Sequence, residues 1–194
     1  MLVLGGCSAK QRGPSYQTVS QPPYQDSIAA QRLNDQGLAF VRKGDVKDAE
    51  RKFREALEKD LYYAPAHNNL GLTLLESQRH YEAAWEFDYA AKLMPHAPEP
   101  RQNLGLVYES LGHLDEAITE YENALRIDPQ NAVAMRHLAR TCVKADQKGE
   151  KLKSVLEKLL LVSSDQQWDV WVRGQLIRLG RADTETQPLH SPPD

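Results

Sequence analysis

The chain has 194 residues, of which 41% are hydrophobic and 26% are charged, and its formal net charge is −3. This composition is that of a soluble globular chain with room for one elongated core, and the even spread of charge excludes a polybasic surface for nucleic acid. No stretch approaches the roughly 20 consecutive apolar residues that a membrane-spanning helix needs.

The chain begins with a short apolar segment, residues 1–7, that ends in Leu4-Gly5-Gly6-Cys7. These four residues resemble the lipobox of bacterial lipoproteins, in which a leucine and two small residues precede a cysteine that accepts a lipid. The resemblance implies that residues 1–7 are the remnant of a signal peptide and that Cys7 is lipidated. Because the segment lacks a basic n-region and a full apolar h-region, either translation starts upstream or the match is accidental and Cys7 is unmodified.

Residues 8–27 are rich in Ser, Gln and Pro, and the pair Pro22-Pro23 disfavours regular structure. We predict that this segment is a disordered tether. About 18 residues of coil span on the order of 25 Å. A lipid on Cys7 would therefore hold the rest of the chain close to a bilayer without pressing it against the surface.

Residues 64–97 and 98–131 are one 34-residue unit written twice, and the two copies align without a gap and are identical at nine positions. Self-similarity at a fixed period predicts a repeat architecture. Small residues recur at unit positions 8, 20 and 27 and large ones at positions 7, 11 and 24, which favours two closely packed helices in each unit. Proline recurs at position 32, as Pro95 and Pro129, and ends the second helix.

This pattern resembles the tetratricopeptide repeat (TPR) at its signature positions, with leucine at 7, glycine at 8, alanine at 20 and 27, and proline at 32. The resemblance implies an all-α fold, a right-handed superhelix or α-solenoid of helix-turn-helix repeats. In the same register, residues 30–63 form a further repeat that departs from the pattern at Gln36 and Leu61. Residues 132–164 form a fourth and degenerate repeat, in which Lys151 replaces the small residue at position 20. The repeat domain as a whole is predicted to span residues 28–180.

Residues 165–179 are predicted to form a last helix, with Ser164 or Asp165 as its N-cap and Gly180 at its end. The helix places Trp168 and Trp171 on one side, which requires a cover, and the exposed flank of the fourth repeat is the simplest one. The helix would then cap the array. The alternative is that the tryptophans form a binding face for a partner or a membrane. Residues 181–194 are predicted to be a disordered tail.

The sequence contains none of the common catalytic or nucleotide-binding motifs, such as H-E-x-x-H, G-x-S-x-G or a P-loop. The six histidines never form an i, i+4 pair, so no metal site is predicted. Cys142 lies at an inward helix position and is interpreted as a small core residue rather than a nucleophile. We therefore expect no enzymatic activity, no cofactor, no metal ion and no nucleic-acid partner.

The resemblance also implies a concave groove lined by the first helix of each repeat. Asn69 and Asn103 recur at position 6, and each amide offers a donor and an acceptor that could hold the main chain of an extended peptide while leucines contact its side chains. The alternative is that these asparagines are tolerated polar surface residues. The candidate groove residues are Asn34, Leu38, Asn68, Asn69, Leu72, Gln102, Asn103, Leu106, Arg136, His137, Arg140 and Lys144.

Arg136, Arg140 and Lys144 repeat at a spacing of four residues, and His137 lies beside them. They predict a basic stripe at the C-terminal end of the groove, which would either dock a carboxylate or phosphate or form an ordinary solvated face. The two-carboxylate clamp of the family needs lysine and asparagine where Asn34 and Leu38 stand, so binding of that type is disfavoured.

The sequence as a whole predicts a scaffold that binds a protein or an extended peptide and is tethered by Cys7 in the bacterial cell envelope. The expected location is the periplasmic side of the outer membrane, and the expected process is assembly of pilus, secretion or cell-wall machinery. Two alternatives remain at this stage. One is a soluble cytoplasmic adaptor with an unmodified Cys7, and the other is the non-catalytic regulatory part of an envelope enzyme. The sequence does not indicate an oligomeric state.

Overall fold

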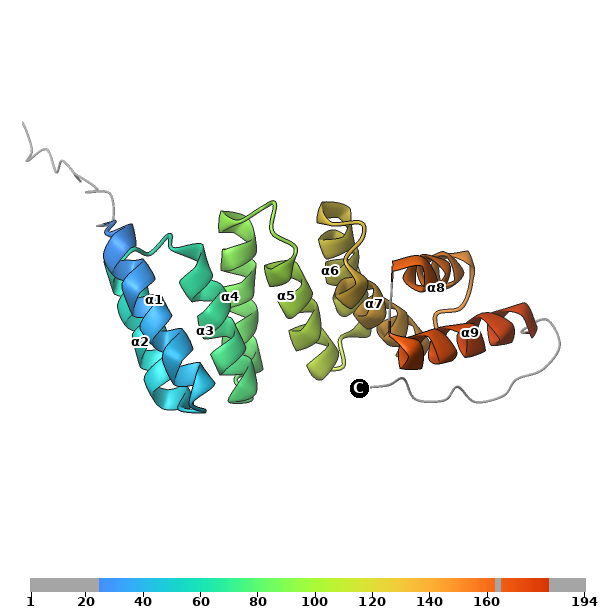
Figure 1. Ribbon diagram of the computed structural model, residues 1–194, viewed down its shortest axis with the longest axis horizontal. Helices are drawn as coiled ribbons and strands as arrows, with labels where there is room; N and C mark the ends of the chain where they lie inside the picture. Colours follow the sequence, from blue (N-terminus) through green and yellow to red (C-terminus); the bar gives the residue numbers. More distant parts are fainter. Residues whose placement is uncertain (1–24, 163–164, 182–194) are drawn as a thin grey trace, which may run out of the picture.

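The computed structural model describes residues 25–162 and 165–181, and within them the chain is helical throughout (Figure 1). Cys7, residues 8–24 of the predicted tether, Ser164 and the predicted tail from residue 182 onward lie outside the described residues. The helices are α1 (Ser27–Arg42), α2 (Val46–Lys59), α3 (Ala64–Glu76), α4 (His80–Leu93), α5 (Glu99–Ser110), α6 (Leu114–Ile127), α7 (Ala132–Lys144), α8 (Glu150–Val162) and α9 (Gln166–Arg181).

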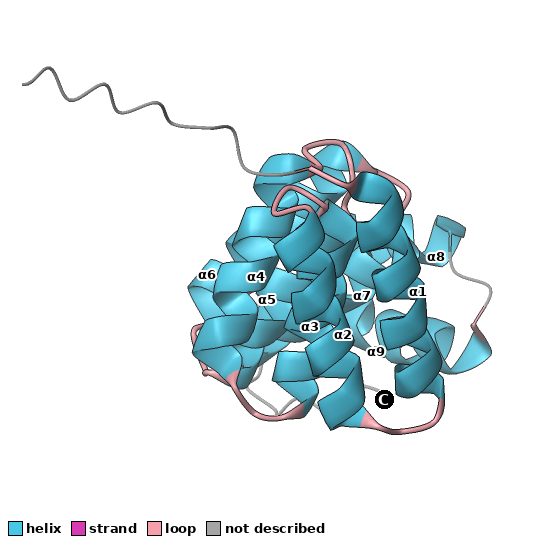
Figure 2. Cartoon of the chain, turned by 90° about the vertical axis from the view of Figure 1, so that its left-hand side faces the viewer, coloured by secondary structure: helices cyan, strands magenta, loops and turns pink. Residues whose placement is uncertain are grey.

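The helices form consecutive hairpins that stack in a row, as Figure 1 shows from the side and Figure 2 shows from the α1 end. Each helix packs against its neighbours in the chain, and the first helices of successive hairpins also contact one another, α1 with α3, α3 with α5, and α5 with α7. Every repeat thus contacts mainly the repeats before and after it, which is the arrangement of a solenoid. The predicted all-α solenoid is confirmed.

The two helices of a repeat approach most closely where a glycine faces an aromatic ring. A Cβ atom added to Gly71 would lie 2.6 Å from a ring carbon of Phe87, and Phe87 is completely buried. The same glycine–ring contact occurs between Gly37 and Phe53 and between Gly105 and Tyr121. In the fourth repeat the corresponding residues are Ala139 and Val155, which belong to one core cluster. There a larger residue at position 8 is combined with a smaller one at position 24.

The turn inside each repeat needs one residue with a left-handed backbone. Gly44 and Gly112 fill this position in the first and third repeats with φ angles of 75° and 77°, and glycine adopts this conformation without the clash that a Cβ causes. Gln78 and Asp146 occupy the equivalent turns of the second and fourth repeats with φ angles of 61° and 52°. These two turns accept the same geometry with less suitable residues.

The last helix packs as a cap on the fourth repeat. Trp168 and Trp171 are buried, their rings meet edge to face at 5.2 Å, and both belong to the core cluster that also contains Leu138 and Leu156. A capping helix requires its tryptophans to be buried in this way.

The N-cap of this helix is Asp165, whose Oδ1 accepts hydrogen bonds from the backbone N–H groups of Gln167 at 3.0 Å and Trp168 at 3.4 Å. The predicted C-terminal end is wrong, because α9 continues through Gly180 to Arg181. Glycine adopts the right-handed helical conformation as readily as the left-handed one, so it permits a helix end without imposing one.

We predict that Gly71→Ala destabilises the domain by about 1–3 kcal/mol, the usual effect of forcing an extra carbon into a packed core, because the new methyl group would overlap the Phe87 ring. Chemical denaturation followed by circular dichroism measures the change. Gly174→Ala in α9 is the matched control, because nothing lies within 4 Å of its added Cβ, and it should leave stability equal or raise it by about 0.5–1 kcal/mol. Equal effects of the two substitutions would contradict the glycine–ring packing.

We also predict that Trp171→Ala lowers the free energy of unfolding by about 3–5 kcal/mol, as large truncations in a core do. The same substitution at Trp85, which is 60% exposed, should have less than a third of that effect. Thermal and denaturant unfolding of both variants measures the two effects. An unchanged melting temperature for Trp171→Ala would show that α9 is no structural cap.

Candidate functional site

The candidate site is the surface of the four first helices, α1, α3, α5 and α7, which we call the first-helix face. These helices contact one another in succession, and every predicted groove residue belongs to one of them. The structure therefore brings the candidate residues, spread over more than a hundred positions in the chain, onto neighbouring helices.

The asparagines of this face bind one another across the repeat boundaries. The side-chain nitrogen of Asn69 donates to Oδ1 of Asn34 at 2.8 Å, and that of Asn103 donates to Oδ1 of Asn68 at 2.9 Å. Asn34 and Asn103 are buried. The prediction that these amides are free to hold a peptide needs correction, since one donor hydrogen of each position-6 asparagine already joins two repeats. Asn69 is half-buried, so its remaining amide hydrogen and its Oδ1 atom are the groups that a ligand would meet.

Leucines lie next to these amide pairs at position 9. Leu72 is 42% exposed, whereas Leu38 and Leu106 are half-buried and pack against the core clusters. Gln102 is also half-buried. Of the predicted leucines, Leu72 thus has the apolar surface that is most available for contact with a bound side chain.

Glu109 is a hub that joins the third repeat to the fourth. Its carboxylate accepts hydrogen bonds from the Tyr121 hydroxyl at 3.1 Å and Arg140 Nη2 at 3.4 Å, and it also pairs with Lys144 Nζ. Burial raises the pKa of Glu109, but the hydrogen bond from Lys144 and the charge of Arg140 outweigh this effect and hold the pKa below its usual value. Burial and the nearby Glu109 carboxylate raise the pKa of Tyr121, so its hydroxyl remains a donor.

The remaining members of the predicted basic stripe are also engaged. Arg136 lies 3.8 Å from the Asp165 carboxylate, and its guanidinium stands 5.4 Å from the centre of the Trp168 ring. His137 stacks on Tyr121 at 5.4 Å, and its Nδ1 lies 3.0 Å from Arg140 Nη2. Burial and then the charge of Arg140 lower the pKa of His137 to about 4, so the ring is neutral near pH 7 and Nδ1 accepts.

The residues of the basic stripe therefore bind partners inside the domain. The interpretation of the stripe as a free docking site for a carboxylate or phosphate loses its main support. Glu109 was not among the candidate groove residues taken from the sequence. The usable signal was an acid at position 12 of one repeat followed, 31 and 35 residues later, by Arg140 and Lys144 at positions 9 and 13 of the next.

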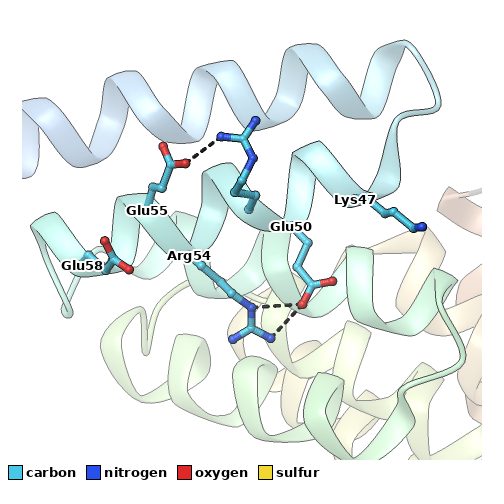
Figure 3. Close-up of a pocket in the computed structure, with 6 residues that line it drawn as sticks. Lys47, Glu50, Arg54, Glu55 and Glu58 are labelled. Atoms are coloured by element: carbon cyan, nitrogen blue, oxygen red, sulfur yellow. Dashed lines mark hydrogen bonds and ion pairs between the residues drawn. The ribbon is translucent and has the colours of Figure 1, made fainter.

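A shallow hollow of about 480 Å³ lies on the outer face of α2 (Figure 3). Four of its charged side chains form ion pairs, with Arg54 2.8 Å from Glu50 and Arg51 2.7 Å from Glu55. The arrangement is an ion-pair network on a helix surface. The lining residues are Lys47, Glu50, Arg51, Arg54, Glu55 and Glu58.

Residues 25–162 and 165–181 contain neither a metal-binding cluster nor a membrane-spanning helix. In this part of the chain, no group of three or more His, Cys, Asp or Glu side chains is placed to hold a metal ion. Among the same residues, no helix has the length and apolar character that crossing a membrane requires. Cys142 is buried, and burial raises the pKa of its thiol to about 11, which keeps it protonated and unreactive.

Comparison with known proteins agrees with this architecture. Sequence models of the tetratricopeptide repeat match residues 34–99 and 98–131. The uncharacterized protein ycf37 of Cyanophora paradoxa is 30% identical over 123 residues, which cover 60% of this chain and 70% of that protein. The chloroplastic tetratricopeptide repeat domain-containing protein PYG7 of Arabidopsis thaliana is 28% identical over 110 residues, and the match spans 55% of this chain but only 36% of PYG7.

Two solved structures show the same fold. Pseudomonas aeruginosa pilF superposes with a TM-score of 0.71 at 21% identity, covering 81% of this chain and 72% of that one. YrrB, a TPR protein described as having an unusual peptide-binding site, superposes with a TM-score of 0.64 at 24% identity, covering 77% of this chain and 76% of that one. The repeat models, the ycf37 match and the stacked hairpins lead to one conclusion: this chain belongs to the tetratricopeptide repeat family.

Proposed function

We propose that this protein is a non-catalytic scaffold that holds an extended segment of a partner protein on its first-helix face, in the concave groove that the family resemblance implies. The observation that carries the proposal is the placement of Leu72, an exposed leucine beside two inter-repeat asparagine pairs whose geometry is fixed before any ligand arrives. A fixed polar surface loses little conformational entropy on binding. The described peptide-binding site of YrrB, which has the same fold, supports the proposal.

The chemistry of the face indicates which segment fits. The candidate residues on α1, α3 and α5 are amides and leucines, and the cations on α7 are paired with Glu109 and Asp165. An acidic segment would have to displace these internal carboxylates. We therefore propose a partner segment with aliphatic side chains and exposed main-chain groups, which the leucine and the amides complement.

The groove proposal is tested with Leu72→Gln, which removes an apolar contact and keeps a good helix former. A displayed library of random peptides is selected on the full chain, and the affinities of the enriched peptides are then measured for the wild type and the variant. Fully burying a leucine is worth about 1.5–3 kcal/mol, and Leu72 has 42% of its surface left to bury. We therefore expect the affinity to fall by roughly threefold to tenfold. The far-ultraviolet circular dichroism spectrum and the melting temperature should not change.

The matched control is Leu161→Gln, the same substitution at a leucine of α8 that is 85% exposed and lies outside the first-helix face. It should leave the affinity of the selected peptides unchanged. If no peptide is enriched, or if both substitutions weaken binding equally, the first-helix face is not the binding surface.

We further propose that Cys7 tethers the scaffold to a membrane of the bacterial cell envelope, on the periplasmic side of the outer membrane, where it serves assembly of a pilus, a secretion apparatus or the cell wall. The support is the residue pattern Leu4-Gly5-Gly6-Cys7 and the polar segment behind it. The first described helix begins at Ser27, so about 20 residues separate the lipid site from the folded domain. That separation leaves the groove accessible to a partner near the bilayer.

Lipidation predicts that the protein incorporates a radioactive fatty acid when the gene is expressed in bacteria from a start codon upstream of Met1. Cys7→Ser should abolish the label and move the protein from the membrane fraction to the soluble one, because the thiol is the acceptor. Cys142→Ser serves as the control, since this cysteine is buried and should have no effect on the label. Equal label in the wild type and Cys7→Ser, or no label in either, would eliminate the anchor.

A further inference from the structure

The outer surface of the second repeat carries an aromatic stripe on α4, formed by the exposed Tyr81 and Trp85 and the half-buried Tyr89, which we call the aromatic patch. Tyr81 is 77% exposed and Trp85 is 60% exposed. The three residues follow each other at a spacing of four, so they share one side of the helix. The rings of Trp85 and Tyr89 stack in parallel with their centres 5.4 Å apart. Large aromatic side chains exposed on one side of a helix mark an interaction surface.

The patch rests on a rigid base made by a buried histidine. His67 of α3 lies behind it, with its ring centre 4.6 Å from that of Tyr89 and 6.3 Å from that of Trp85. Both ring nitrogens are engaged, because Nδ1 lies 2.6 Å from Glu86 Oε2 and Nε2 donates to the backbone oxygen of Leu61 at 2.8 Å. The aromatic rings are thus held in place before they meet a ligand, which lowers the entropy lost on binding.

The N-terminal segment joins the described domain next to this base. The backbone N–H of Asp26 donates to the oxygen of Lys59 at 2.9 Å, and Gln25 forms an isolated β-bridge with Asp60. Leu61, which follows Asp60 directly, is the residue whose backbone oxygen binds His67. The contacts from Gln25 to Asp60, from Leu61 to His67 and from His67 to Tyr89 therefore connect the point where the segment enters the domain with the aromatic patch.

The chemistry of the residues before Gln25 complements the patch. Residues 14–24 read PSYQTVSQPPY and contain no charged side chain, three prolines and two tyrosines. Proline-containing extended segments bind aromatic surfaces because their backbone is already restricted. At about 3.1 Å per residue the eleven residues reach roughly 34 Å in the polyproline II conformation, whereas Tyr81 to Tyr89 spans only about 12 Å along a helix. The segment is therefore long enough to follow the whole stripe.

We propose that residues 14–24 of this chain bind along the aromatic patch, with their prolines and Tyr16 packed on Trp85 and Tyr89. Because the segment is covalently attached, its effective concentration at the patch is on the order of 1 mM. A contact with a Kd of only about 0.1 mM would then keep roughly nine molecules in ten in the bound state. The interaction covers the aromatic surface and fixes the side of the domain from which the N-terminus leaves. It does not depend on lipidation of Cys7 or on the first-helix face.

The test places the photoreactive residue p-benzoylphenylalanine at position 16 of the full chain, in place of Tyr16. After irradiation, mass spectrometry of the digested monomer should locate the cross-links in α4, between residues 80 and 93. Trp85→Ala should lower the cross-link yield about tenfold. The control substitution Leu161→Ala, at a residue on α8 that is 85% exposed, should leave the yield unchanged.

A second measurement uses the natural chain, in which chymotrypsin cleaves after Tyr16. Cleavage there should be about tenfold faster in Trp85→Ala than in the wild type, while the circular dichroism spectra remain the same. Cross-links that join two chains and increase with protein concentration would assign the patch to a second copy and overturn the intramolecular proposal. Cross-links scattered over the domain, or cleavage and cross-link yields unaffected by Trp85→Ala, would also overturn it.

Discussion

The closest approach of the two helices in each repeat is the contact on which the rest of the structure depends. In the first three repeats, a ring at position 24 covers the glycine at position 8, and no Cβ fits between them. This contact sets how near the helices of a hairpin lie and therefore how the hairpin presents its first helix to the next repeat. The inter-repeat hydrogen bonds and the alignment of the first-helix face need that spacing, because hydrogen bonds weaken steeply outside a narrow range of distance and angle.

Polar contacts between neighbouring repeats then fix the orientation of the repeats relative to one another. The asparagine pairs join the first repeat to the second and the second to the third, and the Glu109 hub joins the third to the fourth. Each site residue that takes part in these contacts has both a structural and a potential binding role. Substituting an asparagine of this face leaves a buried amide without its partner, which is destabilising. For this reason the leucine is a cleaner probe of binding than the asparagines.

The two sides of the domain differ in chemistry. The first-helix face combines amides with an exposed leucine, whereas the outer surface of α4 exposes stacked aromatic rings next to the place where the N-terminal segment enters. The two proposals use these surfaces separately. A partner segment on the first-helix face and the N-terminal segment on the aromatic patch can be bound at the same time, so an N-terminal anchor would leave the groove open.

The sequence alone determined the all-α repeat architecture, and it placed Trp168 and Trp171 on the side of the last helix that has to be covered. These features are readable because the information is local or periodic, and the same packing is written several times in the chain. Only the tertiary structure decided the pairing of Asn69 with Asn34, the neutralisation of Arg140 by Glu109 and the burial of His67 beneath the aromatic patch. Asn69 and Asn34 are 35 residues apart in the sequence, Arg140 and Glu109 are 31 apart, and His67 is 19 residues from its hydrogen-bond partner Glu86. The sequence does not show which side chains have a hydrogen-bond partner on a neighbouring helix or repeat, because the two come within hydrogen-bonding distance only when the helices stack.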